Sequence, residues 1–198
     1  PTGPDEHRHF ASAYEKIRAA ELVERKAKED PYVQLARTTI ESYIGNGKKI
    51  ATPKNVPPEM LTQRAGTFVS LKVHGQLRGC IGTIGPVREN IAAEIIGNAI
   101  SASTQDPRFS AVRPDELPDL VYSVDVLGPI EDIDSPDQLD VKRYGVIVTK
   151  GGRRGLLLPN LEGVDTITEQ ISIACQKAGL AANEKDIKLQ RFEVVRHH

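Results

Sequence analysis

The sequence predicts an α+β fold in which helices pack on a mainly antiparallel sheet. Segments with strand-like alternation and segments with helical periodicity follow one another in the order β, β, α, β, β, β, α, β. The length of 198 residues and a hydrophobic content of 39% suit one domain with a sizeable core, with or without a small additional lobe.

The N-terminal part predicts two helices. Residues 5–29 carry dense mixed charge, with residues of opposite sign four positions apart, which favours a solvated helix. We therefore treat residues 1–30 as a charged N-terminal helical extension. Asp30 and Pro31 then read as a cap and a first-turn proline, so a second helix opens here, and a glycine at 45 or 47 can end it.

The middle of the chain predicts a hairpin followed by a helix. Apolar and polar residues alternate over residues 67–74, and Gly75-Gln76 is a plausible tight turn before a partner strand over residues 77–81. Pro86 is expected to open a helix that continues to about Thr104, because apolar residues recur there at helical spacing.

The last third predicts strands, a helix and a closing strand. The pair Thr166 and Glu169 forms a capping box for a helix that Gly179 ends. The expected strands are residues 120–127, a hairpin from 146–149 and 156–158, and a final strand over residues 187–195. We assign residues 31–196 to one domain and expect His197-His198 to be the remnant of a purification tag.

Composition argues against several classes of function. A formal net charge of -1 gives no whole-protein field for nucleic acid, and aromatic residues at 5%, without tryptophan, offer little base stacking. No apolar run approaches the ~20 residues that cross a bilayer, and no signal-peptide profile is seen at the start. Two cysteines do not make a disulfide framework, so we expect a cytoplasmic protein with no membrane contact.

The stretch LRGCIGTIG at residues 77–85 places Cys80 among glycines. In a strand, Arg78 would share a face with Cys80, and its charge would favour the thiolate. Gly79 and Gly82 would leave peptide N–H groups open to a carbonyl or carboxylate. This pattern indicates a thiol site or an anion-binding nest.

A packing role for Cys80 is the more common alternative, because free cysteine is among the most buried residue types. If the thiol is instead a nucleophile, His74 or Asp106 could assist it. Cys175 has helical spacing to apolar neighbours and is assigned to packing. With one internal histidine and two cysteines we predict no metal site, and no cofactor motif is present.

Two further basic positions are candidates for binding an anion. Arg108, in the segment DPRF, either clamps a carboxylate or phosphate or caps the preceding helix. Arg154 belongs to KGGRRG at residues 150–155, a glycine turn that either meets an anionic ligand or carries charge for solubility.

Several separated motifs resemble one known family. They occur in the order LRGCIGT (77–83), DPRF (106–109), YSVDVLGPI (122–130), GVIVTKGGRRGLLLP (145–159) and EQISIACQKAGL (169–180). Over residues 32–195 the chain resembles the AMMECR-like family, labelled AmmeMemoRadiSam system protein A in prokaryotes. The resemblance implies two unequal lobes with the LRGCIGT motif lining a cleft between them. It also implies association with a Memo-like protein and a radical-SAM enzyme, and no established reaction.

Three functions are then weighed. The first is a cytosolic accessory protein that binds a small anionic ligand or partner segment at the LRGCIGT cleft. The second is a cysteine-dependent enzyme with Cys80 as nucleophile, assisted by His74 or Asp106. The third, which the composition disfavours, is a nucleic-acid-binding module. Candidate ligand-binding residues are Arg78, Gly79, Gly82, Thr83, Arg108 and Arg154.

Overall fold

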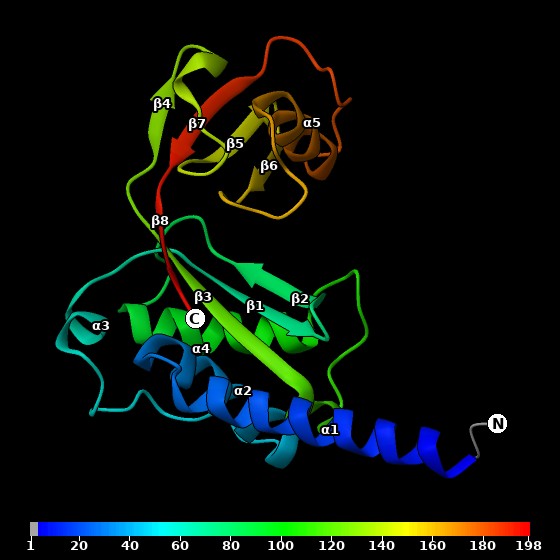
Figure 1. The fold of residues 1–198 in the computed structure, drawn as a ribbon. Coiled ribbons are helices and arrows are strands. Elements are labelled where there is room, and N and C mark those ends of the chain that lie inside the picture. The colour runs from blue at the N-terminus through cyan, green and yellow to red at the C-terminus, as the bar shows by residue number, and fades with distance from the viewer. Residues whose placement is uncertain (1–3) are drawn as a thin grey trace.

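The computed structural model describes the backbone of residues 4–198, with side chains except those of residues 1–12, 14, 25 and 26. Figure 1 shows helices and strands along the whole described chain. The α-helices are α1 (Pro4–Ala27), α2 (Pro31–Asn46), α3 (Pro58–Thr62), α4 (Ile91–Thr104) and α5 (Ile167–Lys177). The strands are β1 (Thr67–Val73), β2 (Gln76–Gly82), β3 (Leu120–Leu127), β4 (Glu131–Ile133), β5 (Gly145–Lys150), β6 (Arg153–Leu157), β7 (Lys188–Phe192) and β8 (Val194–His197). Two short 3-10 helices span Pro114–Asp119 and Pro136–Gln138.

The strands form two four-stranded antiparallel sheets, which confirms the α+β prediction. The first sheet has the order β2-β1-β3-β8, and the second has the order β4-β7-β5-β6. The first sheet with α2 and α4 makes a larger lobe, and the second sheet with α5 makes a smaller one (Figure 1). Two chain segments join them, between β3 and β4 and between β7 and β8, and the Gly128 N–H donates to the Glu193 carbonyl (2.8 Å) where they meet.

One face of the first sheet is a hydrophobic core and the other faces the smaller lobe. Side chains alternate along a strand, so Val69 and Leu71 of β1 point into the core beneath α2 and α4. The intervening residues Phe68, Ser70 and Lys72 point the opposite way and line a cavity. Alternate side chains of β1 therefore stabilise the core, and the others line the space between the lobes.

The predicted caps of α2 and α5 are confirmed. The Asp30 carboxylate accepts the Val33 N–H (3.1 Å), and Gly47 ends α2 with φ 68°. Thr166 accepts the Glu169 N–H (3.2 Å) at the start of α5. These local contacts use side chains close in sequence, which is why the sequence reveals them.

The expected start of α4 at Pro86 is wrong. The helix begins at Ile91, because the Asn90 side chain accepts the Ala93 N–H (2.8 Å) as its cap. Residues 86–90 instead fold around the carboxylate of Glu94, which is fully buried and accepts two backbone N–H groups and the Arg88 guanidinium.

The hairpin between β1 and β2 differs from the expectation in two ways. Val73 pairs with Gln76, so the two-residue turn is His74-Gly75, both with positive φ (54° and 77°), and not Gly75-Gln76. The register also shifts between Leu71 and Lys72, which leaves Arg78 as an extra residue in β2.

The predicted final strand is two strands that belong to different sheets. The chain bends at Glu193, so β7 pairs in the smaller lobe and β8 continues in the larger one.

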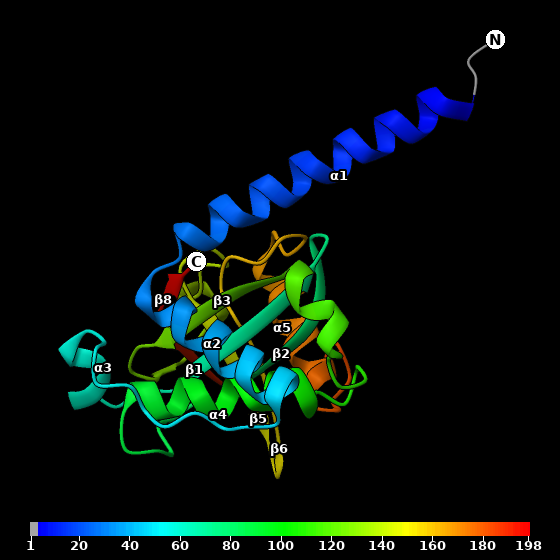
Figure 2. The ribbon, with the colours of Figure 1, turned by 90° about the horizontal axis from the view of Figure 1, so that it is seen from below.

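Figure 2 shows α1 extending away from the body of the molecule. Across residues 4–198, no helix has both the length and the apolar character that a membrane span requires.

Candidate functional site

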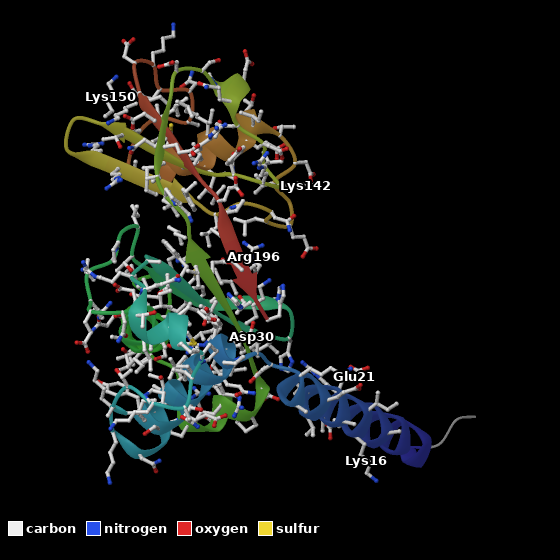
Figure 3. All side chains as sticks on the ribbon, turned by 90° about the vertical axis from the view of Figure 1, so that its left-hand side faces the viewer. Lys16, Glu21, Asp30, Lys142, Lys150 and Arg196 are labelled. Carbon is white, nitrogen blue, oxygen red and sulfur yellow. The ribbon has the colours of Figure 1, made fainter. Side chains whose placement is uncertain are left out.

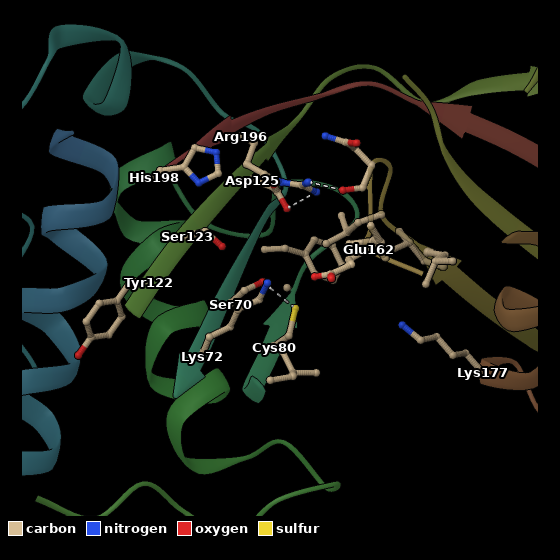
Figure 4. Close-up of a pocket in the computed structure, with 18 of the residues that line it drawn as sticks. Ser70, Lys72, Cys80, Tyr122, Ser123, Asp125, Glu162, Lys177, Arg196 and His198 are labelled. Atoms are coloured by element: carbon tan, nitrogen blue, oxygen red, sulfur yellow. Dashed lines mark hydrogen bonds and ion pairs between the residues drawn. The ribbon is translucent and has the colours of Figure 1, made fainter. Parts of the chain in front are cut away.

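A cavity of about 770 Å³ lies between the two sheets (Figure 4). Strands β1, β2 and β3 of the larger lobe line one side of it, and β6, residues 158–162 and α5 of the smaller lobe line the other. Its volume falls within the range of about 300–1,000 Å³ that is typical of small-molecule sites.

The strand register builds the floor of this cavity as a row of small polar side chains. Ser70 on β1 is directly opposite Cys80 on β2 and Ser123 on β3, so the three side chains lie side by side on the cavity face. Ser70 donates a hydrogen bond to the Cys80 Sγ (3.2 Å). The adjacent row consists of Gly82, Phe68 and Asp125.

The Cys80 thiol lines the cavity but is not activated. Desolvation raises the pKa of the Cys80 thiol above its ordinary value. The hydrogen bond from Ser70 and the charges of Lys177 and Arg108 act in the opposite direction without reversing the shift. The thiol is therefore protonated at neutral pH, which does not favour a nucleophilic role.

We predict that Cys80 reacts slowly with iodoacetamide at pH 7. The rate should rise with pH and reach half its maximum above the ordinary thiol pKa, because only the thiolate is alkylated and burial disfavours it. Mass spectrometry measures the extent of alkylation. In the Cys175→Ala variant Cys80 is the one remaining cysteine, so all alkylation of thiols occurs there. A midpoint below the ordinary thiol range would contradict this account.

Asp106 lies behind the floor and holds Arg108 at the cavity. Asp106 is 4% exposed, and its carboxylate accepts the Cys80 N–H (3.0 Å) and the Arg108 N–H (3.1 Å). The Arg108 guanidinium donates to both carboxylate oxygens (2.8 and 3.1 Å). These hydrogen bonds, with that of the Arg108 guanidinium the largest effect, lower the pKa of Asp106 to about 2. Asp106 is thus an anchor for Arg108 and a poor general base.

Arg78 does not point into the cavity, which corrects the expectation that it shares a face with Cys80. Because Arg78 is the extra residue of the bulge, its side chain turns toward the loop before β3. There it donates to both oxygens of Glu116 (2.8 and 3.1 Å) and to the carbonyls of Ser110 and Ala111. Arg78 therefore ties β2 to this loop.

Neither His74 nor Thr83 lines the cavity. His74 is exposed in the hairpin turn, six positions before Cys80. The Thr83 hydroxyl accepts a hydrogen bond from the buried Asn98 side chain (3.1 Å). The structure thus brings Asp106 next to Cys80 and leaves His74 apart from both.

Close packing explains the glycines at positions 79 and 82. A Cβ on Gly79 would lie 2.3 Å from the Ala102 carbonyl oxygen of α4. A Cβ on Gly82 would lie 2.4 Å from the Thr67 carbonyl oxygen and would also meet the Phe68 ring. Of the two, only Gly82 lines the cavity.

The smaller lobe contributes two cations to the cavity. Arg154 of β6 was a sequence candidate, whereas Lys177, the last residue of α5, was not singled out. Desolvation, followed by the charge of Arg108, lowers the pKa of the Lys177 ammonium, while Cys80 and Asp106 act in the opposite direction. Within the described residues, neither Arg154 nor Lys177 has an ion-pair partner.

Arg196 joins the two lobes at one end of the cavity. Its guanidinium binds the Asp125 carboxylate of β3 (2.8 and 3.3 Å) and donates to the carbonyls of Pro159 and Asn160 (2.8 and 2.9 Å). Figure 3 shows Arg196 near the junction of the lobes. No local pattern predicts this contact, because the partners of Arg196 are 36 to 71 positions away.

Comparisons with known proteins agree with the fold. The AMMECR1 family model matches residues 33–197. A Thermotoga maritima protein is 53% identical over 170 residues, which cover 85% of this chain and 98% of that protein. A Clostridium acetobutylicum protein is 51% identical, and the match covers 92% of this chain but only 39% of that longer protein. The crystal structure of an uncharacterised Pyrococcus horikoshii protein has a TM-score of 0.77 at 38% identity, covering 83% of this chain and 88% of the other.

Proposed function

Because the chain belongs to the AMMECR1 family, we propose that it works through the cavity between its lobes, as a binding protein for a small anionic ligand. The proposal rests on one observation. Arg108 from the larger lobe and Arg154 and Lys177 from the smaller lobe all line the same cavity. Only Arg108 has a carboxylate partner among the described residues, and Asp106 cannot neutralise all three cations.

The uncompensated cations favour an anion over a neutral ligand. A cavity with low-dielectric walls strengthens the field of the cations that line it. A carboxylate or phosphate bound there would accept hydrogen bonds from Arg154 and Lys177, which have no carboxylate partner within the described residues. Three acidic residues also line the cavity: Glu29 is paired with Arg37, Asp125 is paired with Arg196, and Glu162 has no partner within the described residues.

The rest of the ligand is expected to be apolar. A set of hydrophobic side chains packs between the lobes and lines the cavity, formed by Phe68, Ile84, Leu156, Leu158 and Leu161. Burial of an apolar body against this set would supply affinity, while the cations select the anionic group.

The observations favour binding over catalysis by a cysteine nucleophile. Burial keeps the Cys80 thiol protonated, His74 lies outside the cavity lining, and the Asp106 carboxylate is already used by Arg108 and the Cys80 amide. Neither His74 nor Asp106, the two residues that the sequence offered as a base, is therefore placed to take the thiol proton.

For the biological setting we propose an accessory role beside a Memo-like protein and a radical-SAM enzyme in the cytoplasm, as the family resemblance implies. The longer clostridial relative is compatible with a domain that also works as part of a larger chain. The ligand site and this setting are separate proposals, and the first can be tested with the purified protein.

The test compares two fluorescent probes that differ in charge. The first, 8-anilinonaphthalene-1-sulfonate (ANS), combines an aromatic body with a sulfonate, and N-phenyl-1-naphthylamine has the same body without the charge. We expect ANS to bind at least tenfold more tightly than the neutral probe, with an affinity that falls as salt is raised, because the cations are partly solvated.

The double variant Arg154→Ala/Lys177→Ala should weaken ANS binding at least tenfold and change the neutral probe little. Lys142→Ala is the matched control for loss of a surface cation, because Lys142 is exposed on the smaller lobe and does not line the cavity (Figure 3). Equal affinities of the two probes, or an unchanged ANS affinity in the double variant, would refute the proposed site.

A further inference from the structure

We propose that Lys177 forms an imine with its ligand, so that the cleft takes an oxo acid whose aldehyde or ketone lies close to its carboxylate. This inference rests on the proposed function, because it uses the same cavity and the same cations. It adds a covalent step and a substrate class that anion binding alone does not imply.

The first support is the position of Lys177. Gly155 of β6 lets the end of α5 approach closely, since a Cβ there would lie 2.1 Å from the Ala174 carbonyl oxygen and 2.8 Å from the Ala178 nitrogen. This close packing sets Lys177 at the rim of the cavity, and its side chain extends toward Cys80 and the floor (Figure 4). The amine therefore faces the space that a ligand would fill.

The second support is the chemical environment of the amine. Lys177 is exposed at the cavity, and within the described residues no carboxylate pairs with it. Desolvation, followed by the charge of Arg108, lowers the pKa of its ammonium group. Both effects disfavour the ammonium form and enlarge the fraction of neutral amine, which is the form that attacks a carbonyl. Desolvation and an adjacent cation are the two means by which proteins activate lysine for this chemistry.

The third support is Arg108, which fixes where the carbonyl must be. Arg108 is held by Asp106 and is close enough to Lys177 to affect its ionisation. A carboxylate bound to Arg108 would therefore lie in the same cavity as the amine of Lys177. The ligand's carbonyl must lie near its carboxylate to be reached.

The step is balanced without any further reactant. The lone pair of the Lys177 nitrogen forms a bond to the carbonyl carbon, and the carbonyl π electrons move to oxygen. That oxygen gains both protons of the amine through proton transfers and leaves as water, while nitrogen and carbon form the C=N bond. The hydroxyls of Ser70 and Ser123 line the floor of the same cavity.

Reductive trapping tests the proposal. The full-length protein is incubated with pyruvate or glyoxylate and sodium cyanoborohydride, which reduces an imine to a stable amine, and the modified lysines are identified by peptide mass spectrometry. We expect label on Lys177 at least tenfold faster than on any other lysine. Acetone lacks the carboxylate, so its preference for Lys177 over the other lysines should be much smaller. To compare the compounds, each labelling rate is divided by the rate at which the same compound labels N-acetyl-lysine.

Two variants complete the experiment. Lys177→Arg keeps the positive charge but has no amine that forms an imine, so it should lose the fast label while its melting curve shows a folded protein. The Lys142→Arg variant is the matched control. Its Lys177 should be labelled as fast as Lys177 of the parent protein. The pH dependence of the fast label should reach its midpoint below the ordinary lysine pKa.

The outcomes separate the two proposals. If both oxo acids label the surface lysines evenly while ANS binding still depends on its sulfonate, the imine proposal is refuted. The proposed anion site is then supported on its own. Absence of both the fast label and charge-dependent ANS binding overturns both. Fast label at Lys177 that persists with acetone would refute the oxo-acid class.

Discussion

Replacing Gly79 by alanine is expected to lower the free energy of unfolding by about 3 kcal/mol. The new methyl group would lie 2.3 Å from the Ala102 carbonyl oxygen, which is backbone of α4 and cannot turn aside. Relief of this overlap requires β2 and α4 to separate, and α4 is packed across the core. Urea denaturation of the variant and the parent protein measures the difference.

Gly85→Ala is the matched control for this prediction. Gly85 closes the same glycine-rich stretch, yet a Cβ there meets no atom within 4 Å, so stability should change by less than about 0.5 kcal/mol. If the Gly79 variant is as stable as the Gly85 variant, then close packing is not the reason for the glycine at position 79.

Replacing Asp106 by asparagine should lower stability at pH 7 by about 2 kcal/mol. The folded pKa of Asp106 is about 2, against 3.8 for an ordinary aspartate, and one pKa unit corresponds to about 1.4 kcal/mol. Because the folded pKa is lowered, this contribution is fully present above pH 5 and is lost as pH falls from about 4 toward 2.

The pH dependence separates this effect from a packing change. Between pH 7 and pH 3 the stability gap between the parent protein and Asp106→Asn should shrink by about 1 kcal/mol, because the parent protein loses roughly half of its carboxylate contribution. Asp134→Asn, at an exposed position with no side-chain partner within the described residues, should show no such gap at pH 7. A gap that stays constant with pH would show that Asp106 acts without its charge.

The sequence predicted the architecture better than the directions of its side chains. Capping residues such as Asp30 and Thr166 lie next to the helices they start, so local patterns reveal them. The LRGCIGT stretch does contribute to the cavity lining, through Leu77, Cys80 and Gly82, as the family resemblance implied. What failed were inferences about which way a side chain points.

The failures share a cause in tertiary structure. A one-residue bulge turned Arg78 from the cavity toward Glu116, and Gly79 beside it is a signal shared by bulges and by close backbone approaches. A glycine that exposes its amide and a glycine that admits a neighbouring backbone look the same in sequence. At Gly79 the neighbour is Ala102 of α4, 23 positions later.

The cations of the smaller lobe were partly missed for the same reason. Arg154 stood out because it lies in a glycine-rich turn with two other basic residues, whereas Lys177 is a single lysine at the end of an ordinary amphipathic helix. Only the packing of that helix against β6 brings Lys177 to the same cavity as Cys80 and Arg108.

The central claim is that cations from both lobes make the cavity a binding site for an anion. The most direct test measures the dissociation constant of ANS at low salt for the parent protein, for Arg154→Ala/Lys177→Ala and for Lys142→Ala. A loss of tenfold or more in the double variant, with Lys142→Ala indistinguishable from the parent, is the predicted outcome. Identical constants for all three proteins would contradict it.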